Sequence, residues 1–146
     1  CCRDFENHGL NGNISQCSIS LNTKKNTLRG MHYQKKPYAE AKLVRCSRGF
    51  IYDVIVDLRY DSSTFKEWTS IEISAENRKM VYVPEGFAHG FQTLTDNVEV
   101  IYQMSQFYSP SHADGFRWDD PSFRIDWPSK DLVISLKDQN YPDFKL

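Results

Sequence analysis

The feature that most constrains the fold of this chain is a series of short segments in which apolar and polar residues alternate. These segments are rich in β-branched and aromatic residues, and clusters of Gly, Pro, Asn and Asp separate them. A side-chain period of two residues is typical of a half-buried β-strand and not of a helix. We therefore expect an all-β domain with strands at 16–21, 27–34, 41–47, 50–59, 67–74, 79–84, 89–94 and 97–105.

The number and spacing of these strands favour a sandwich, a jelly roll or a barrel. A short helix is predicted near residues 3–10, with Gly9 at its end. After Pro110 the sequence becomes rich in Asp, Pro and Trp, so we expect residues 111–132 to form a structured loop that wraps the barrel. No repeat or low-complexity tract divides the chain, and one domain spanning 1–146 is predicted.

Alternation within residues 50–59 indicates what the barrel encloses. One face carries only apolar and aromatic side chains, whereas the other mixes Ile51 and Ile55 with Asp53, Asp57 and Arg59. Such a half-polar face either meets solvent or lines a lumen wide enough to hold a ligand. A similar split recurs in residues 97–105, which favours a polar lumen.

Composition excludes several classes of partner. With 18 basic and 19 acidic residues, the chain has no basic field that would attract nucleic acid. No apolar run approaches the ~20 residues needed to cross a bilayer, and the start does not resemble a signal peptide. We expect a cytoplasmic protein that acts on a small molecule. The four cysteines form no CxxC pair and are predicted to be reduced thiols: Cys1, Cys2, Cys17 and Cys46.

The most specific local motif is "PEGFAHGF" at 84–91, which resembles the second cupin motif, where a histidine (here His89) points into a jelly-roll lumen. The first cupin motif would need a second histidine two positions after His32, followed by a glutamate. Gln34 stands there instead, and Glu40 is out of register. Because a catalytic metal normally takes three protein ligands, we expect no metal.

His32 is then a candidate acid–base group. An imidazole can take a proton near neutral pH if another group orients it, so a carboxylate partner is expected. On spacing alone, the alternative is a half-buried strand histidine whose nitrogens bond to backbone groups.

Seven stretches in a fixed order bear on this choice: "TLRGMHYQ", "AKLVRCSRGFIYDVIVDLR", "SSTFKEW", "SAENRKMVYVPEGFAHGF", "FYSPSHADGFRWDDP", "IDWP" and "SLKDQN". Through them the chain from Gln16 to Phe144 resembles the dTDP-4-dehydrorhamnose 3,5-epimerases and related deoxysugar epimerases. The resemblance implies a cupin-type jelly roll (double-stranded β-helix) with short flanking helices, a homodimer, no metal or other cofactor, and action on a dTDP-linked 4-keto-6-deoxy sugar.

The resemblance also implies roles for individual residues. The base is His32, oriented by Asp138; the general acid is Tyr108; and Lys42 steadies the enolate oxygen. The implied substrate contacts are Arg29, Gln34, Asp53, His89, Gln16, Ser135 and Arg117.

These roles suit the chemistry. Removing a proton beside a ketone creates an enolate whose charge needs a fixed cation or donor, and inversion needs a proton donor on the opposite face. Arg29 and His32 have opposite parity on their strand, so contact of both with substrate predicts a bulge near Gly30.

Each residue alone has a simpler explanation. Lys42 could be solvated, Tyr108 stacked on Pro110, and Asp138 a helix cap. Asp53 could pair with Arg45 or Arg48, and His89 could brace the lumen. Alternative functions are a single-position epimerase or ketoisomerase, a non-catalytic sugar-nucleotide binder, and a metal-dependent cupin oxygenase.

Two departures from the family concern the nucleotide. Relatives usually carry an N-terminal Asp-x-Arg-Gly-x-Phe segment whose arginine helps to hold the diphosphate, and we expect this chain to lack that arm. The usual Gln-Asp-Asn-His-Ser stretch is here "QCSIS". Nucleotide binding is therefore expected to be less secure than the proton chemistry.

Overall fold

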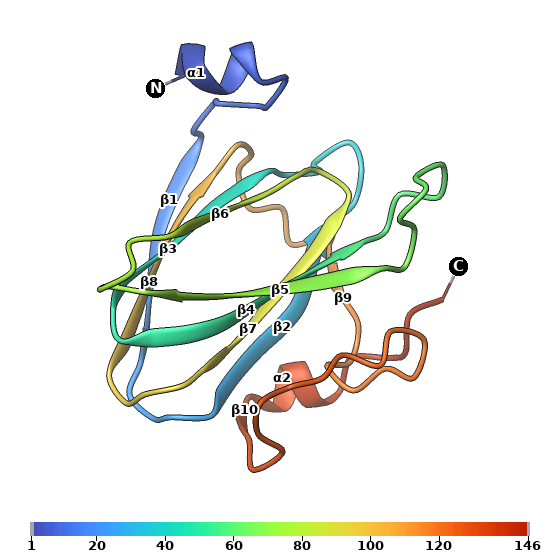
Figure 1. Ribbon diagram of the computed structural model, residues 1–146. Helices are drawn as coiled ribbons and strands as arrows, with labels where there is room; N and C mark the ends of the chain where they lie inside the picture. Colours follow the sequence, from blue (N-terminus) through green and yellow to red (C-terminus); the bar gives the residue numbers. More distant parts are fainter. Residues whose placement is uncertain (1, 146) are drawn as a thin grey trace.

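Two facing β-sheets and two short helices make up the computed structural model, which describes residues 2–145 (Figure 1). The first sheet has the order β1 (Gln16–Asn22), β8 (Val98–Met104), β3 (Lys42–Arg48) and β6 (Met80–Val83). The second has the order β10 (Val133–Ile134), β2 (Thr27–Gln34), β7 (Phe87–Thr93), β4 (Phe50–Asp57) and β5 (Trp68–Ser74), with β9 (Ala113–Gly115) also beside β2. All pairings except β10 with β2 are antiparallel. The predicted all-β jelly roll is confirmed.

Each of the eight predicted strands is present, as β1 to β8. The predicted N-terminal helix is α1 (Cys2–Asn7), followed by Gly9 with φ 69°. The second helix, α2 (Leu136–Gln139), agrees with the short flanking helices that the resemblance implied, whereas the two- and three-residue strands β10 and β9 were not predicted. Elements this short carry too little periodicity to be recognised from sequence.

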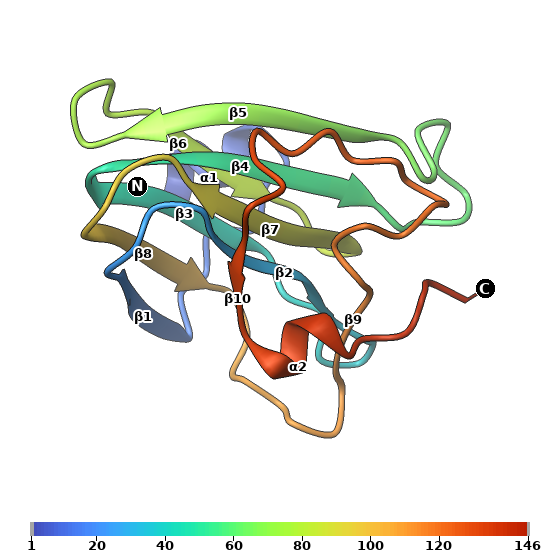
Figure 2. The ribbon, with the colours of Figure 1, turned by 90° about the horizontal axis from the view of Figure 1, so that it is seen from below.

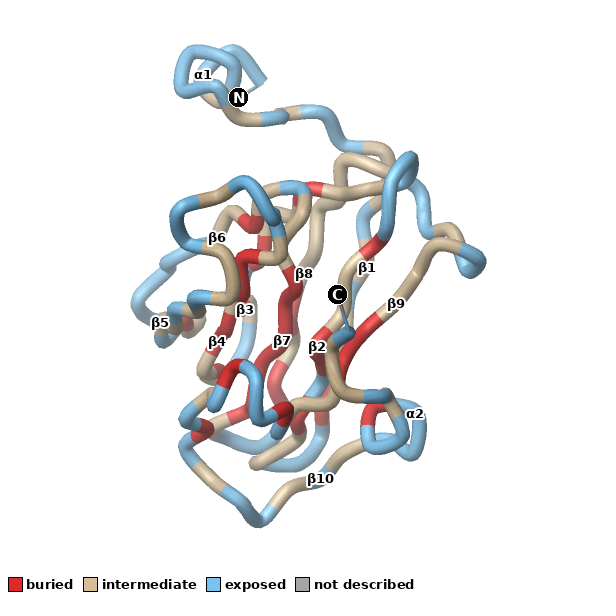
Figure 3. The backbone as a smooth tube through the Cα atoms, turned by 90° about the vertical axis from the view of Figure 1, so that its right-hand side faces the viewer, coloured by how far each residue is buried: buried red, intermediate tan, exposed pale blue. Residues whose placement is uncertain are grey.

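The second sheet is covered on both faces. Between the sheets lies a core that includes Ile51 and Phe91, both at most 1% exposed. The opposite face, with Val54 and Val56, packs against Phe116 and its neighbours in the segment after β9. Figure 2 shows this segment running along the second sheet, and Figure 3 shows buried residues concentrated along β2, β4 and β7.

Because both faces of the second sheet are covered, the structure decides whether the half-polar face of β4 meets solvent or lines the lumen. Its half-polar face turns toward the lumen, since Ile51 belongs to the inter-sheet core and Asp53 is 1% exposed. In β8 the mixed face of polar and apolar residues was expected to line a polar lumen, and this prediction was wrong. Val98, Val100 and Tyr102 join the inter-sheet core, so the polar face with Glu99 points outward. The polar groups of the lumen therefore do not come from that face of β8.

A bulge in β2 brings Arg29 and His32 to the same cavity. The register with β7 shifts between these residues, as predicted near Gly30. Gly30 has φ +133°, and a Cβ atom there would lie 2.6 Å from Cα of Gly90. Added at Gly90, a Cβ atom would lie 2.6 Å from Sδ of Met31. Facing glycines are thus required where the two strands approach.

The cysteines of the described chain, Cys2, Cys17 and Cys46, are free thiols, in line with the prediction, while Cys1 lies outside the described residues. No helix within residues 2–145 is long and apolar enough to cross a membrane.

Candidate active site

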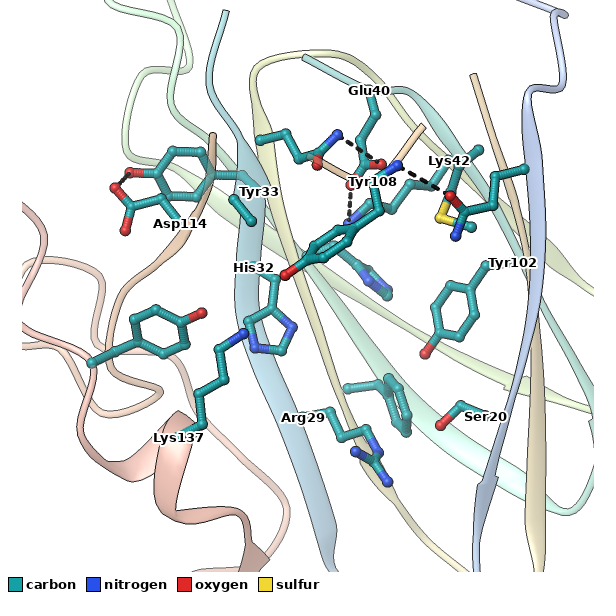
Figure 4. A pocket seen from close by; sticks show the side chains of 17 residues that line it. Ser20, Arg29, His32, Tyr33, Glu40, Lys42, Tyr102, Tyr108, Asp114 and Lys137 are labelled. Carbon is teal, nitrogen blue, oxygen red and sulfur yellow. Dashed lines mark hydrogen bonds and ion pairs between the residues drawn. The ribbon is translucent and has the colours of Figure 1, made fainter. Parts of the chain in front are cut away.

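A cavity of about 320 Å³ opens between the sheets (Figure 4). The second sheet contributes Arg29, His32, Gln34 and His89 to its wall. The first sheet contributes Gln16, Ser20, Lys42, Tyr102 and Met104, and the segments outside the sheets add Glu40, Tyr108, Lys137 and Tyr141. Seven of the eleven predicted site residues line this cavity: Gln16, Arg29, His32, Gln34, Lys42, His89 and Tyr108.

The histidine of β2 has the predicted carboxylate partner. Nε2 of His32 lies 2.7 Å from Oδ1 of Asp138, whose side chain is 5% exposed. Ser135 is the N-cap of α2, and its hydroxyl accepts a hydrogen bond from the Asp138 amide, so Asp138 is not the cap. A carboxylate accepting from Nε2–H leaves Nδ1 of His32 with the lone pair that a base needs.

Asp138 is held as a carboxylate. Burial alone would raise its pKa, but the hydrogen bond and charge of His32, with help from the Gly30 amide and Ser135, hold that pKa below its usual value. Asp138 can therefore orient His32 and stabilise its protonated form.

A second histidine–carboxylate pair lies deeper in the lumen. Nε2 of His89 lies 2.8 Å from Oδ2 of Asp53, and both side chains are almost fully buried. Asp53 thus pairs with a histidine instead of Arg45 or Arg48. His89 faces His32 across the β2–β7 pairing and also lines the cavity, so it both braces the lumen and is within reach of a ligand.

Lys42 is a largely enclosed cavity residue, which excludes the solvated alternative. Its side chain is 12% exposed, and Nζ lies 3.0 Å from Oε1 of Glu40. Burial of a charged pair inside a cavity is costly unless the two charges are in contact, as they are here.

Gln34 and Gln16 hold the loop that follows β8. Oε1 of Gln34 accepts from the Ser109 amide at 2.7 Å, and Oε1 of Gln16 accepts from the Tyr108 amide at 3.1 Å. These bonds place Tyr108 at the cavity, where its side chain remains 55% exposed.

Tyr102 is a cavity residue that the sequence-based list of site residues omitted. It lies on β8 across the cavity from His32 (Figure 4). Burial, and then the charge of Asp53, raise its pKa well above the usual value for a tyrosine, with Arg29 opposing them. Its phenol therefore keeps its proton at neutral pH. The alternation of residues 97–105 was the available signal, because it placed Tyr102 on the same face as Val98 and Val100.

Lys137 and Tyr141 were also omitted from that list. Nζ of Lys137 lies 5.9 Å from the centroid of the Tyr141 ring, and the Tyr141 ring lies 5.7 Å from that of His32. Lys137 directly precedes Asp138 in "SLKDQN", so it was the nearest available cation to a residue already selected.

Arg117, Ser135, Asp53 and Asp138 do not line the cavity. Asp53 and Asp138 each contact a histidine that does line it, and Ser135 caps the helix that carries Asp138. Arg117 is bound instead by Asp119, and its Nη2 atom lies 3.0 Å from Oδ1 of Asp143. Local partners occupy both side chains, namely two carboxylates at Arg117 and the Asp138 amide at Ser135. Direct ligand contact by Arg117 and Ser135 stays a prediction.

Within residues 2–145, no group of three or more His, Cys, Asp or Glu side chains could hold a metal ion. The fold and the site thus define a class: a jelly roll whose cavity carries imidazoles paired with carboxylates, a largely enclosed lysine and phenols, the groups used in acid–base catalysis.

The chain belongs to the dTDP-4-dehydrorhamnose 3,5-epimerase family, whose sequence profile matches residues 1–145. A dTDP-4-dehydrorhamnose 3,5-epimerase from Shigella flexneri is 47% identical over 120 residues, which cover 82% of this chain and 66% of that protein. The chain thus spans slightly less than two thirds of that relative.

Solved structures show the same cupin jelly roll. The dTDP-4-dehydrorhamnose 3,5-epimerase of Bacillus anthracis, with TDP and PPi bound, has a TM-score of 0.95 and 40% identity, covering 99% of this chain and 82% of that one. ChmJ, a 3′-monoepimerase from Streptomyces bikiniensis in complex with dTDP-quinovose, has a TM-score of 0.88 and 31% identity, covering 97% and 71% of the two chains.

Proposed function

We propose that this chain is an epimerase that inverts carbon 3, carbon 5 or both in a dTDP-linked 4-keto-6-deoxy sugar. The observation that carries the proposal is the His32–Asp138 pair at one wall of a cavity that also holds Lys42 and Tyr102. The nucleotide in the Bacillus anthracis relative supports a nucleotide-linked substrate.

In this proposal His32 removes the proton next to the ketone, and Asp138 stabilises the imidazolium that forms. The electrons move to the ketone oxygen and create an enolate. Lys42 meets that charge with its ammonium group inside a partly desolvated cavity, where a fixed cation is far more effective than in water.

Inversion then needs a proton from the other face of the sugar ring. His32 lies on β2 of the second sheet and Tyr102 on β8 of the first, so a ring bound between the sheets meets them from opposite sides. We assign the proton donor to Tyr102, because it lines the cavity opposite His32. Tyr108, the donor expected from the family resemblance, stays a competing prediction at the same cavity.

The remaining cavity residues are proposed to bind the substrate. Arg29 and Lys137 supply positive charge for the diphosphate, and Gln16 supplies an amide. His89, held by Asp53, is proposed to bond a sugar hydroxyl. Gln34 contributes by holding the loop that carries Tyr108.

The test is incubation of the chain with a dTDP-4-keto-6-deoxyhexose in heavy water, followed by NMR of the sugar. We expect deuterium at a carbon beside the ketone, together with inversion, and loss of both in His32→Ala. Exchange no faster in the parent than in His32→Ala would overturn the proposal. Binding of dTDP without exchange would point to a non-catalytic binder.

A single-position epimerase is the second candidate, supported by the similarity to the Streptomyces bikiniensis 3′-monoepimerase. Both candidates share the same base and enolate, so the distinction lies in which ring carbon acquires deuterium. A ketoisomerase would instead move the carbonyl, which the same spectra would detect.

We also propose one domain that forms a homodimer. β1 is the edge strand of the first sheet, and its outward face exposes Ile19 and Leu21 by 66% and 59%. An exposed apolar edge is typical of a surface that another chain covers. Light scattering should give the mass of a dimer.

Free thiols support a reducing compartment, and we propose the cytoplasm.

A further inference from the structure

We propose that Glu40 is a positioning residue that fixes the ammonium group of Lys42 in the cavity. The inference rests on the proposed function of Lys42. Oε1 of Glu40 lies 3.0 Å from Nζ of Lys42, and the two side chains are 9% and 12% exposed. Glu40 is out of register with a metal motif in the sequence, yet the fold brings it into the cavity wall.

The position of Glu40 suits this role. It lies in the connection between β2 and β3, two residues before Lys42 at the start of β3. Its other oxygen, Oε2, lies 3.4 Å from Nε2 of Gln34 on β2. The carboxylate is thus placed between the two sheets, with Gln34 on one side and Lys42 on the other.

Lysine needs such a partner if it is to stabilise an enolate. Its ammonium group sits at the end of a flexible four-carbon stem, whereas transition-state stabilisation requires a donor that is already in place. An ammonium group has three hydrogens, so one can bond to Glu40 and two remain for a ligand oxygen.

The other carboxylates around the cavity are engaged elsewhere in the described chain. Asp138 binds His32, Asp53 binds His89, and Asp114 pairs with Lys35. Glu40 is accordingly the carboxylate that balances the charge of Lys42, and its loss would leave a buried ammonium without a counter-charge.

The experiment compares kcat and KM for deuterium incorporation in the parent, Glu40→Gln, Lys42→Met and the double variant. Glu40→Gln keeps the size of the side chain and removes its charge. We expect it to lower kcat by about 10-fold to 100-fold with little change in KM, less than the ~100- to 1,000-fold expected when the donor itself is lost. In the Lys42→Met background, Glu40→Gln should cause no further loss of kcat, because the two residues act as one unit.

Glu99→Gln is the matched control, since Glu99 lies on the outward face of β8 and bonds to Ser47. It should leave both constants unchanged. An active parent with an equally active Glu40→Gln would overturn this inference alone, as would a further loss of kcat in the double variant. A parent without exchange would overturn the proposed function and this inference with it.

If Glu40→Gln fails to fold, Glu40→Asp decides the question. It keeps the charge but shortens the side chain by one methylene group, which moves the carboxylate away from Nζ. A lower kcat at similar KM supports positioning, and unchanged constants overturn it.

Discussion

Nε2 of His32 lies 2.7 Å from Oδ1 of Asp138, although 106 positions separate the two residues in the sequence. The contact exists because the chain after β9 crosses the outer face of the second sheet and returns to β2 through β10 and α2. The proposed base therefore depends on how this C-terminal segment is held.

Asp138→Asn should lower kcat by about 100-fold to 10,000-fold, because a neutral amide neither stabilises the imidazolium nor fixes the tautomer of His32. Deuterium incorporation measures this. Asp131→Asn is the control, since Asp131 is exposed and lies outside the cavity. Activity of Asp138→Asn equal to that of the parent would exclude the assigned role.

The same substitution should change how stability depends on pH. The native pKa of Asp138 lies below its usual value, whereas an unfolded aspartate has a pKa of about 3.9. Its contribution to the free energy of unfolding is therefore fully present above that value and is lost as the pH falls through the native pKa. The advantage of the parent over Asp138→Asn should shrink as the pH falls below about 4, where the Asp138 carboxylate takes up a proton. An advantage that keeps growing below about pH 4 contradicts this.

Tyr102→Phe should separate exchange from inversion. Without the proposed donor, His32 can still remove and return a proton on its own face, so deuterium enters without a change of configuration. We expect inversion to fall by about 100-fold or more, with exchange much less affected. Tyr108→Phe is the matched comparison. If Tyr108→Phe shows this separation and Tyr102→Phe does not, the donor is Tyr108.

Arg29→Gln and Arg117→Gln should have different effects. Arg29 lines the cavity, and loss of a charged hydrogen bond to the diphosphate should raise KM about tenfold or more. Arg117 is bound by Asp119 and Asp143 outside the cavity, so its variant should keep the KM of the parent. Steady-state kinetics checks both, and a raised KM in Arg117→Gln would show that the arginine reaches the ligand.

Phe116→Ala should weaken the attachment of the C-terminal segment. The Phe116 ring is fully buried, and its centroid lies 4.4 Å from that of Phe123. Removing it should lower the free energy of unfolding by about 3–5 kcal/mol, measured in urea. Phe107→Ala is the control, because Phe107 is 64% exposed. Equal losses in the two variants would contradict this account of the outer core.

Much of the fold was predictable because it depends on local pattern. All eight long strands follow from the period of two. The bulge near Gly30 follows from the opposite parity of Arg29 and His32 together with the substrate contacts that the resemblance implied for both. The outward face of β8 was predicted wrongly, because alternation separates two faces without saying which one meets the other sheet. The contact between Arg117 and Asp143 was not predicted, because nothing in the local sequence shows that the two side chains lie together.

Local sequence pattern is enough to place the strands and to group the side chains of each face, since both depend on neighbours along the backbone. Which residues meet across the fold depends on how the elements pack. Asp138 contacts His32, Glu40 contacts Lys42, and Tyr102 faces His32 because two sheets and a crossing segment pack around one cavity. Such contacts arise from burial of apolar faces against one another, and sequence spacing does not encode them.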